Sequence, residues 1–533
     1  MTLRFKLLWF FIALGFGLLI NEVNLHYVKA NNPENAERNT KSTVYGYTIW
    51  SIDNSWYLPQ IKNLVAGQGY TSDLDNPEMR VRRTPGYPLF YGLHYLIFGE
   101  KYSFLAIRYT QSILKALSVI LLGSAVVFFT GNIKLAKTAT IMFAFCPFTA
   151  VYTYYTLTES LYPFIFILSV YLFSKALARN KKVFFVFAGI TLACLALVRP
   201  TAGMLLPVLL LALLVEGWSS RGSIRFALTN GALVIVGFVA AMSPWIVRNY
   251  IVTNGELVPL EKYYNESSMD YGKGHTYFAR WWSCWDNPAA EIYSNGVLDT
   301  IAGPTPEKHF EKADEFLDSL PEYAYSGSSR EEVRNSLISL NLCFENRLLA
   351  QKATASEHHN LWVSPHPGCE EEVKSKFLGL TNNFKAAAPF RYYVITPLVI
   401  TKDTVFHSFS SAYGSLNPED HHPGSKQSFI KGLMYALNSL LFISFLLIGF
   451  TKKLNPGFKL LLVLFPLVTI LFFAYINRYV ETRYILAAYP FFYIALAYFG
   501  LEIATITSPL LRALFRQEVN GMIAEESLRA SGD

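Results

Sequence analysis

The residues that could do chemistry gather in one polar stretch near the start of the chain, residues 51–88. The stretch carries a carboxylate, Asp53, near its beginning and ends in the basic sequence RRTPGYP, which includes Arg83. Hydrophobic segments flank it on both sides. A carboxylate can accept a proton from a hydroxyl group, and arginine can contact two phosphate oxygens at once. These groups, held against a membrane, suit an enzyme that acts on a phosphate-bearing lipid.

The composition indicates a membrane protein. Hydrophobic residues make up 52% of the chain and charged residues only 16%, and the mean hydropathy is +0.26. A soluble domain is about one-quarter charged. The net charge of +7 fits basic cytoplasmic loops, which orient membrane proteins. Because no basic stripe interleaved with aromatics lies on a soluble segment, we expect no nucleic-acid partner.

Apolar runs predict an all-α polytopic membrane protein with about ten transmembrane helices, judged against the roughly 17–25 residues that cross a bilayer. The predicted spans are residues 7–20, 104–129, 139–152, 161–177, 183–198, 202–215, 226–247, 429–450, 460–475 and 484–506. The first is interpreted as a retained helix, because no small-residue cleavage site of a signal peptide follows it. The prolines inside these runs are tolerated in membrane helices when neighbours satisfy the freed carbonyls.

Lysine and arginine in short loops predict the sidedness of the spans. They place both termini in the cytoplasm, in a cytoplasmic (inner) membrane, with the active site on the extracytoplasmic side. The expected parts are an amino-terminal transmembrane module (1–249) with a catalytic first exported loop (22–103), an extracytoplasmic domain (250–427), carboxy-terminal membrane helices (428–506) and a cytoplasmic tail (507–533).

The chain has five cysteines and several loop histidines that are candidates for disulfide or metal positions. Cys284, Cys343 and Cys369 lie in the expected exported domain, where one disulfide and one free thiol are the most we predict. The pairing stays open. No Cys/His spacing typical of a metal site is present, and the histidines are interpreted as surface residues. These are His358, His359, His366, His421 and His422.

Six short motifs follow one another in an order that is informative as a set. They are Asp53 after the first span, RRTPGYPLFY, TLTES, LVRP, PWIVRN and ETRYILAAYP. Together they resemble the GT-C superfamily of membrane glycosyltransferases. The nearest likeness is to the branch that uses polyprenyl-phosphate sugars and includes protein O-mannosyltransferases and the lipid A aminoarabinose transferase. The resemblance covers about the first 250 residues and the last hundred, and none is seen in 250–427.

The resemblance implies a GT-C-like fold and roles for matching residues. The acid of the first exported loop, here Asp53, would be the general base, although Asn54 stands where many relatives have a second acid. Glu159 of TLTES matches a further acid of the family, which would orient acceptor or sugar. Arg83 and Arg483 match ligands of the donor phosphate. Additional candidates in the same motifs are Arg82, Tyr87 and Tyr484.

The chemistry itself favours these residue types. Sugar transfer passes through an oxocarbenium-like state while negative charge builds on the departing phosphate. Fixed arginines stabilise that charge, and the acceptor hydroxyl needs a base within hydrogen-bonding distance. Attack opposite the phosphate predicts inversion at the anomeric carbon. No cofactor is required, and a divalent metal is not demanded because two arginines can neutralise the phosphate.

Each of these residues also has a simpler interpretation. Asp53 could cap the helix that begins near Asn54, and Glu159 could be a solvated turn residue. Arg83 could contact lipid headgroups. Arginines at segment ends are otherwise expected to reach the membrane interface. This expectation applies to Arg199, Arg248 and Arg478, while Arg80 and Arg82 are expected to contact lipid headgroups. Arg483 flanks the last helix similarly, but its ETRY motif favours a site role.

The function predicted from these observations is transfer of a sugar from a polyprenyl-phosphate carrier to an acceptor hydroxyl on the outer face of the membrane. The acceptor, a lipid, glycan or protein, would be chosen by the domain at 250–427. Two alternatives remain. A transporter or flippase would place ionisable residues near the middle of its spans, whereas here the charges gather at one face. An enzyme similar to O-antigen ligases or polymerases would place its key arginines and histidine in late exported loops.

Overall fold

The chain is almost entirely helical. The computed structural model describes residues 1–31, 43–49, 51, 54–74, 77–219, 223–262, 272–286, 306–353, 367–413, 416, 426–480 and 482–505. Over these residues the only sheet is a short antiparallel hairpin of β1 (Thr43–Val44) and β2 (Thr48–Ile49). Helices satisfy their own backbone hydrogen bonds, as segments surrounded by lipid must.

Eight helices of the described residues are long and apolar enough to cross a membrane. These are α1 (Leu3–Asn31), α3 (Gly86–Thr130), α6 (Thr158–Arg179), η4 (Pro200–Met204) with α8 (Leu205–Ser219), α9 (Ile224–Val252), α16 (Lys426–Ile448), α17 (Pro456–Leu471) with η11 (Phe472–Asn477), and η12 (Thr482–Ala488) with the helix that continues to Thr505. The bent pair α4 (Ile133–Ala144) and α5 (Pro147–Ala150) with η3 (Val151–Tyr154) would make a ninth. The predicted all-α polytopic membrane fold is confirmed.

Two predicted spans differ in detail from the observed helices. The predicted helix 104–129 is only the second part of α3, which already begins at Gly86. Gly99 interrupts α3 with φ 71° and ψ 177°, a conformation that glycine adopts at little cost. The predicted helix 139–152 is broken by a bend of 54° after α4. Helix α7 (Lys182–Val198) has 17 residues, the lower limit for a span.

Glycines allow α7 and α9 to pack with their backbones nearly in contact. A Cβ atom on Gly189 of α7 would lie 2.0 Å from the Val234 carbonyl oxygen of α9. In the reverse direction, a Cβ atom on Gly237 would lie 2.2 Å from the Val186 carbonyl oxygen. Close approach at small residues is a common way for membrane helices to associate, because lipid provides no hydrophobic force between them.

Lys115 is a charged side chain that lies inside the bundle, so the expectation that all charges gather at one face needs a correction. Lys115 of α3 is buried, and its Nζ donates to the Phe143 carbonyl oxygen at 3.1 Å and lies 3.6 Å from the Phe143 ring centroid. The same carbonyl accepts from the Cys146 amide at 3.1 Å, at the break between α4 and α5. Lys115 therefore adds a second donor to a carbonyl at the bend.

A second group of helices packs around its own hydrophobic core. It comprises α10 (Gly272–Trp282), α12 (Pro306–Ser319), η6 (Glu322–Tyr325), α13 (Arg330–Ala353) and α14 (Pro367–Ala387). A disulfide between Cys343 and Cys369 joins α13 to α14, and Cys284 is free and buried. This fits the expectation of one disulfide and one free thiol, and it settles the pairing.

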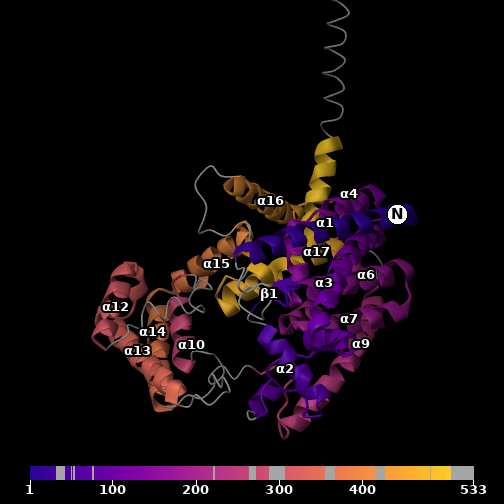
Figure 1. The fold of residues 1–533 in the computed structure, drawn as a ribbon. Helices are drawn as coiled ribbons and strands as arrows, with labels where there is room; N and C mark the ends of the chain where they lie inside the picture. Colours follow the sequence, from indigo (N-terminus) through magenta and orange to yellow (C-terminus); the bar gives the residue numbers. More distant parts are fainter. Residues whose placement is uncertain are drawn as a thin grey trace, which may run out of the picture.

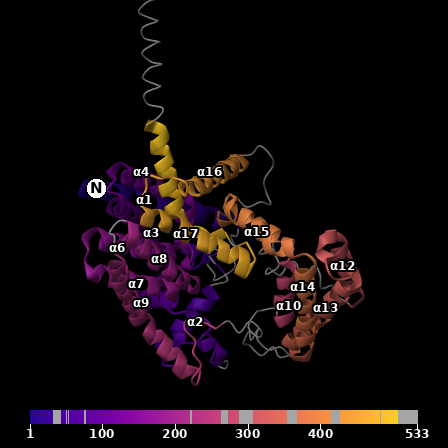
Figure 2. The same cartoon turned by 180° about the vertical axis from the view of Figure 1, so that it is seen from behind.

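The second group lies to one side of the membrane helices. In Figures 1 and 2, α12, α13 and α14 stand apart from the main body of the molecule, and α15 (Thr396–Val405) lies between the two. The π-helical turn η7 (Arg391–Ile395) leads from α14 into α15, which packs against α17 and η11. The remaining short elements are α2 (Asn54–Val65), η2 (Pro77–Arg80) and η8 (Ser410–Ala412).

Candidate functional site

Glu159 is a buried carboxylate that two arginines, Arg199 and Arg483, approach. It lies in the first turn of α6, where the helix dipole favours a negative charge, and it is 2% exposed. Its Oε1 accepts a short hydrogen bond from Arg199 and lies 3.6 Å from Nε of Arg483. Its Oε2 accepts from the Thr158 hydroxyl at 3.2 Å. The interpretation of Glu159 as a solvated turn residue is therefore wrong.

Arg199 is the member of this group that the sequence analysis missed. It was expected at the membrane interface, but its side chain is 13% exposed and it is ion-paired with Glu159. Its Nε also donates to Thr158 Oγ1 at 2.7 Å. The aromatic ring of Tyr484 lies 4.5 Å from the Arg199 guanidinium and 5.3 Å from that of Arg483. We call Glu159, Arg199 and Arg483 the arginine–carboxylate cluster.

The helix ends explain why these three residues meet. Glu159 is the second residue of α6, Arg199 directly follows α7, and Arg483 is the second residue of η12. Helices α6 and α7 are consecutive and packed together, so the start of one lies beside the end of the other. The signal available in the sequence was the arginine–proline pair at the end of an apolar run, because a charge there must find a partner when it is buried.

Tyr87 connects the polar first loop to the turn that carries Glu159. It is fully buried, its ring lies 4.7 Å from that of Tyr57 in α2, and its hydroxyl donates to Gln111 Oε1 at 3.1 Å. The Gln111 amide donates in turn to the carbonyl oxygens of Thr153 at 2.9 Å and Tyr155 at 2.8 Å. These contacts fix the start of α3 against residues 153–155, the segment that leads into TLTES.

Arg83 belongs to a neighbouring network that holds the basic segment of the first loop. The buried Tyr70 hydroxyl donates to the Arg83 carbonyl at 3.2 Å and to the Thr84 carbonyl at 3.1 Å. Burial raises the pKa of the Tyr70 hydroxyl well above its usual value, so it remains a donor. The amide of Thr84 donates to Glu261 at 3.4 Å, and Arg248 donates to the Tyr70 carbonyl at 2.7 Å.

These contacts correct two expectations for arginines at the interface. Arg248, at the end of α9, is held by the first loop through the carbonyls of Tyr70 and Arg80, and its guanidinium lies 4.9 Å from the Trp245 ring. Arg82 is 6% exposed, with Nη1 3.6 Å from the Met79 sulfur, so it is not a headgroup contact. Arg82 thus supports the loop from within.

A close backbone contact brings the two arginine networks together. A Cβ atom on Gly86, three residues after Arg83, would lie 2.6 Å from the carbonyl carbon and oxygen of Leu197, two residues before Arg199. The RRTPGYP and LVRP motifs are therefore in direct contact. The β2 residue Ile49 also forms an isolated bridge with Tyr155, which joins the first loop to the TLTES turn.

Asp53 lies outside the described residues, so its contacts are not assigned. Its described neighbours are Ser51 and Asn54, which are joined by a hydrogen bond from the Asn54 amide to the Ser51 carbonyl at 2.9 Å. Asn54 is the first residue of α2, the helix whose Tyr57 contacts Tyr87. The predicted roles of Asp53 as base or as helix cap stay predictions. The histidines His358, His359, His366, His421 and His422 also lie outside the described residues.

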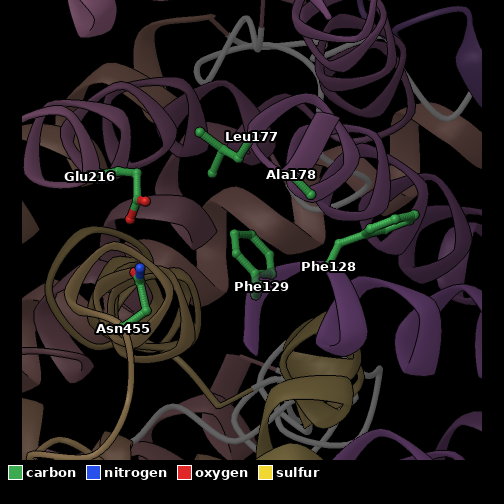
Figure 3. Close-up of a pocket in the computed structure, with 6 residues that line it drawn as sticks. All are labelled: Phe128, Phe129, Leu177, Ala178, Glu216 and Asn455. Atoms are coloured by element: carbon green, nitrogen blue, oxygen red, sulfur yellow. The ribbon is translucent and has the colours of Figure 1, made fainter. Parts of the chain in front are cut away.

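Figure 3 shows a cavity that shares no lining residue with the arginine–carboxylate cluster. It has a volume of about 140 Å³ and is lined by Phe128, Phe129, Leu177, Ala178, Glu216 and Asn455. Along α6, 18 residues separate Glu159 from Leu177, which corresponds to roughly 27 Å at 1.5 Å per residue. The cavity therefore lies near the end of α6 opposite to the arginine–carboxylate cluster.

Residues 82–247 match the family model of the dolichyl-phosphate-mannose-protein mannosyltransferases. This part of the chain is similar to that family. The match runs from Arg82 to Val247 and so includes Arg83, Glu159 and Arg199. The resemblance to glycosyltransferases of the GT-C superfamily that use polyprenyl-phosphate sugars is confirmed. Among curated proteins, no sequence matches the chain.

Solved structures of two membrane enzymes resemble the chain. The apo oligosaccharyltransferase of Archaeoglobus fulgidus is 15% identical with a TM-score of 0.46, over 96% of this chain and 51% of that one. The same archaeal enzyme, solved with an inhibitory peptide and a dolichol-phosphate, gives 13% and 0.44. ArnT from Cupriavidus metallidurans, bound to undecaprenyl phosphate, is 12% identical with a TM-score of 0.33, over 80% and 84%. The chain spans about half the length of the archaeal enzyme.

Proposed function

We propose that the protein is a membrane glycosyltransferase that moves a sugar from a polyprenyl-phosphate carrier to an acceptor hydroxyl group. The observation that supports this most is the arginine–carboxylate cluster, formed by helix ends that meet the first loop. Two guanidinium groups on one side of a buried carboxylate form a preorganised cationic site, which suits a phosphate better than a neutral ligand. The match to the mannosyltransferase family model points to the same chemistry.

Arg483 and Arg83 are the proposed ligands of the donor phosphate. Arg483 is the more loosely held partner of Glu159, at 3.6 Å, and its side chain is 20% exposed. Arg199 is buried and engaged with Glu159 and Thr158. We therefore assign Arg199 to positioning Glu159 and Arg483 to contact with phosphate oxygens. Charge that develops on the leaving phosphate is stabilised without reorganisation, because the arginines are already in place.

Asp53 is the proposed general base. In the proposed step the acceptor oxygen attacks the anomeric carbon while its proton passes to the Asp53 carboxylate. The bond between that carbon and the phosphate oxygen breaks, and its electron pair stays on the phosphate. The products are the glycoside and the polyprenyl phosphate. A single attack from the face opposite the phosphate inverts the anomeric configuration, which NMR of the product would establish.

The proposed site lies on the extracytoplasmic side of a cytoplasmic membrane, with both termini in the cytoplasm. This orientation rests on the distribution of lysine and arginine in short loops. We further propose that the second helical core, within 250–427, is extracytoplasmic and selects the acceptor. The Cys343–Cys369 disulfide supports an oxidising compartment for it. Exchanging this segment for that of a relative without a change of acceptor preference would contradict the assignment.

Transport is less well supported by the contacts. Lys115 is a charged residue within a described span, yet its ammonium group is held by a backbone carbonyl and an aromatic ring. Residues of a transport pathway instead line a cavity or pair with coupling ions near the midplane.

The test is mass spectrometry of envelope glycolipids and glycoproteins from a strain that lacks the protein. The strain is complemented with the wild type, Asp53→Asn or Arg483→Ala, at matched expression. We expect a sugar-sized mass increment with the wild type and its loss in both variants. A general base contributes about 10²–10⁴ in rate and a charge-stabilising donor about 10²–10³. No glycan change with the wild type would overturn the proposal, and full activity of Asp53→Asn would reduce that residue to a helix cap.

A further inference from the structure

Arg478 occupies a backbone conformation that arginine seldom adopts. Its φ is 55° and its ψ 42°, in the left-handed region, and its amide donates to the Phe473 carbonyl at 2.8 Å to end η11. Glycine is the usual residue at such a helix end, because it adopts a positive φ without steric cost. A long side chain retained in this conformation indicates a role for the side chain.

The side chain of Arg478 reaches from the membrane helices to the second helical core. It is buried, and its Nε donates to the Ser283 carbonyl at 3.0 Å and its Nη2 to the Tyr392 carbonyl at 3.1 Å. The guanidinium also lies 4.0 Å from the centre of the Tyr392 ring. Three segments far apart in the sequence therefore meet at one guanidinium group.

The end of α10 receives two further side chains. The Cys284 carbonyl accepts from the Thr396 hydroxyl at 3.0 Å, and the Trp285 carbonyl accepts from Arg391 Nε at 3.3 Å and Nη2 at 3.2 Å. Carbonyl groups at the end of a helix have no helical partner and carry partial negative charge, so cationic donors suit them. The α10 joint is our name for the carbonyls of Ser283, Cys284 and Trp285 together with the side chains that donate to them, Arg478, Thr396 and Arg391.

The joint is close in sequence to the proposed phosphate ligand. Arg478 lies five residues before Arg483, which approaches Glu159 at 3.6 Å. Arg391 lies in η7, which leads directly into α15, and Thr396 is the first residue of α15. In Figures 1 and 2, α15 lies between the second core and the membrane helices. A displacement of α10 would therefore also displace Arg478 and the segment that carries Arg483.

We propose that Arg478 is a positioning residue that couples the second helical core to the donor-phosphate site through Arg483. This inference rests on the proposed function for its ligand, a polyprenyl phosphate. An acceptor bound by the second core would, through the joint, set the geometry of the cation that holds the leaving group. Arg478 itself touches neither substrate.

The test uses the full-length protein and removes the Arg478 side chain without straining the backbone. Arg478→Gly keeps a residue suited to positive φ, so the local helix end is expected to persist. The matched control is Asn180→Gly, which makes the same change at φ 50°, at the end of α6 that is far from the site. The probe is undecaprenyl phosphate, and its Kd is measured with both variants, Arg483→Ala and the double variant.

We expect Arg478→Gly to raise the Kd about tenfold, Asn180→Gly to leave it unchanged, and the double variant to bind as weakly as Arg483→Ala alone. Such non-additivity shows that Arg478 acts through Arg483, which a merely structural residue would not do. Wild-type binding by Arg478→Gly, or a tenfold loss that adds to that of Arg483→Ala, would overturn the inference.

A second measurement separates failure of the inference from failure of the proposed function. Hydrogen exchange at the amides of Tyr479, Val480 and Arg483 is compared between the wild type and Arg478→Gly without ligand. Faster exchange in the variant supports the joint even if the wild type does not bind undecaprenyl phosphate, in which case only the proposed function fails. Unchanged exchange, together with unchanged binding, would refute the joint while leaving the glycosyltransferase proposal intact.

Discussion

At the scale of single residues, the shared carboxylate of Glu159 is the centre of the site. Arg199 donates from Nε and from a terminal nitrogen to two different oxygen atoms, Thr158 Oγ1 and Glu159 Oε1. Lysine offers a single ammonium group and cannot reproduce this planar arrangement. The Arg199–Glu159 ion pair therefore depends on the planar geometry of the guanidinium group as well as on its charge. The ring of Tyr484 beside both guanidinium groups also favours arginine over lysine.

Removal of the Arg199 side chain is expected to cost both stability and activity. In Arg199→Ala a buried carboxylate loses its nearer partner, which costs about 3 kcal/mol or more when an ion pair is buried. Thermal unfolding in detergent would measure the loss, and Arg199→Lys is expected to recover only part of it. The double variant Arg199→Met with Glu159→Gln should be more stable than Arg199→Ala. Equal stability of Arg199→Ala and the wild type would contradict the buried pair.

Transfer without a metal is a second expectation at this scale. Arginines are the proposed partners of the leaving phosphate, so activity should survive dialysis against EDTA with little change. Loss of activity on chelation, restored by one divalent metal and not by others, would show that a metal takes part and that Asp53 has to be considered as its ligand.

At the scale of elements, the site depends on how closely the start of α3 approaches the end of α7. Gly86 is the first residue of α3 and has no side chain to separate the two backbones. The contact fixes Arg83 relative to Arg199 although the two are far apart in the sequence. Tyr87, the next residue, is buried and reaches the TLTES turn through Gln111.

Gly86→Ala is expected to reduce activity more than its size suggests. The new methyl group would lie 2.6 Å from the Leu197 backbone, so the two elements must separate, at a cost of about 1–3 kcal/mol. A displacement of 1 Å at a site can lower a rate by about 10²-fold. Transfer assays and thermal unfolding are compared with Gly432→Ala in α16, where a Cβ atom meets nothing within 4 Å. Equal effects of the two substitutions would contradict the role of the contact.

At the scale of the whole molecule, two hydrophobic cores are joined by η7, α15 and the α10 joint. The larger core is made by the membrane helices and the smaller one by α10, α12, α13 and α14. The smaller core includes buried Trp281 and Trp285 and is closed by the disulfide between α13 and α14. Substitutions in the smaller core should therefore change the acceptor preference before they change the stability of the membrane helices.

Removal of the disulfide is expected to destabilise only the smaller core. Cys343 and Cys369 are 26 positions apart in the sequence, and closing a loop of this length stabilises a fold by about 3–4 kcal/mol. In the double variant Cys343→Ser with Cys369→Ser, limited proteolysis should cut more rapidly between α10 and α14, while the membrane helices stay protected. A reducing agent should have the same effect on the wild type and no further effect on the variant. Unchanged protection in both would contradict this prediction.

The apolar segments and the all-helical membrane fold could be predicted from the sequence. Length and apolarity are local properties, and a segment in lipid has no alternative to a helix, so these predictions needed no knowledge of neighbours. The order of Arg83, Glu159 and Arg483 along the chain also gave the family resemblance. The kink at Gly99 and the bend after α4 were missed, because one glycine or proline leaves hydropathy nearly unchanged.

Partnerships were decided only by the tertiary structure. Arg199 looked like an interfacial arginine until the end of α7 was found beside the start of α6, where a buried carboxylate needs a cation. The pairing of Cys343 with Cys369, and the contact of Arg478 with the end of α10, likewise depend on which distant segments meet. Composition and spacing specify what each segment is, whereas a salt bridge, a disulfide or a joint requires two segments to be placed in space.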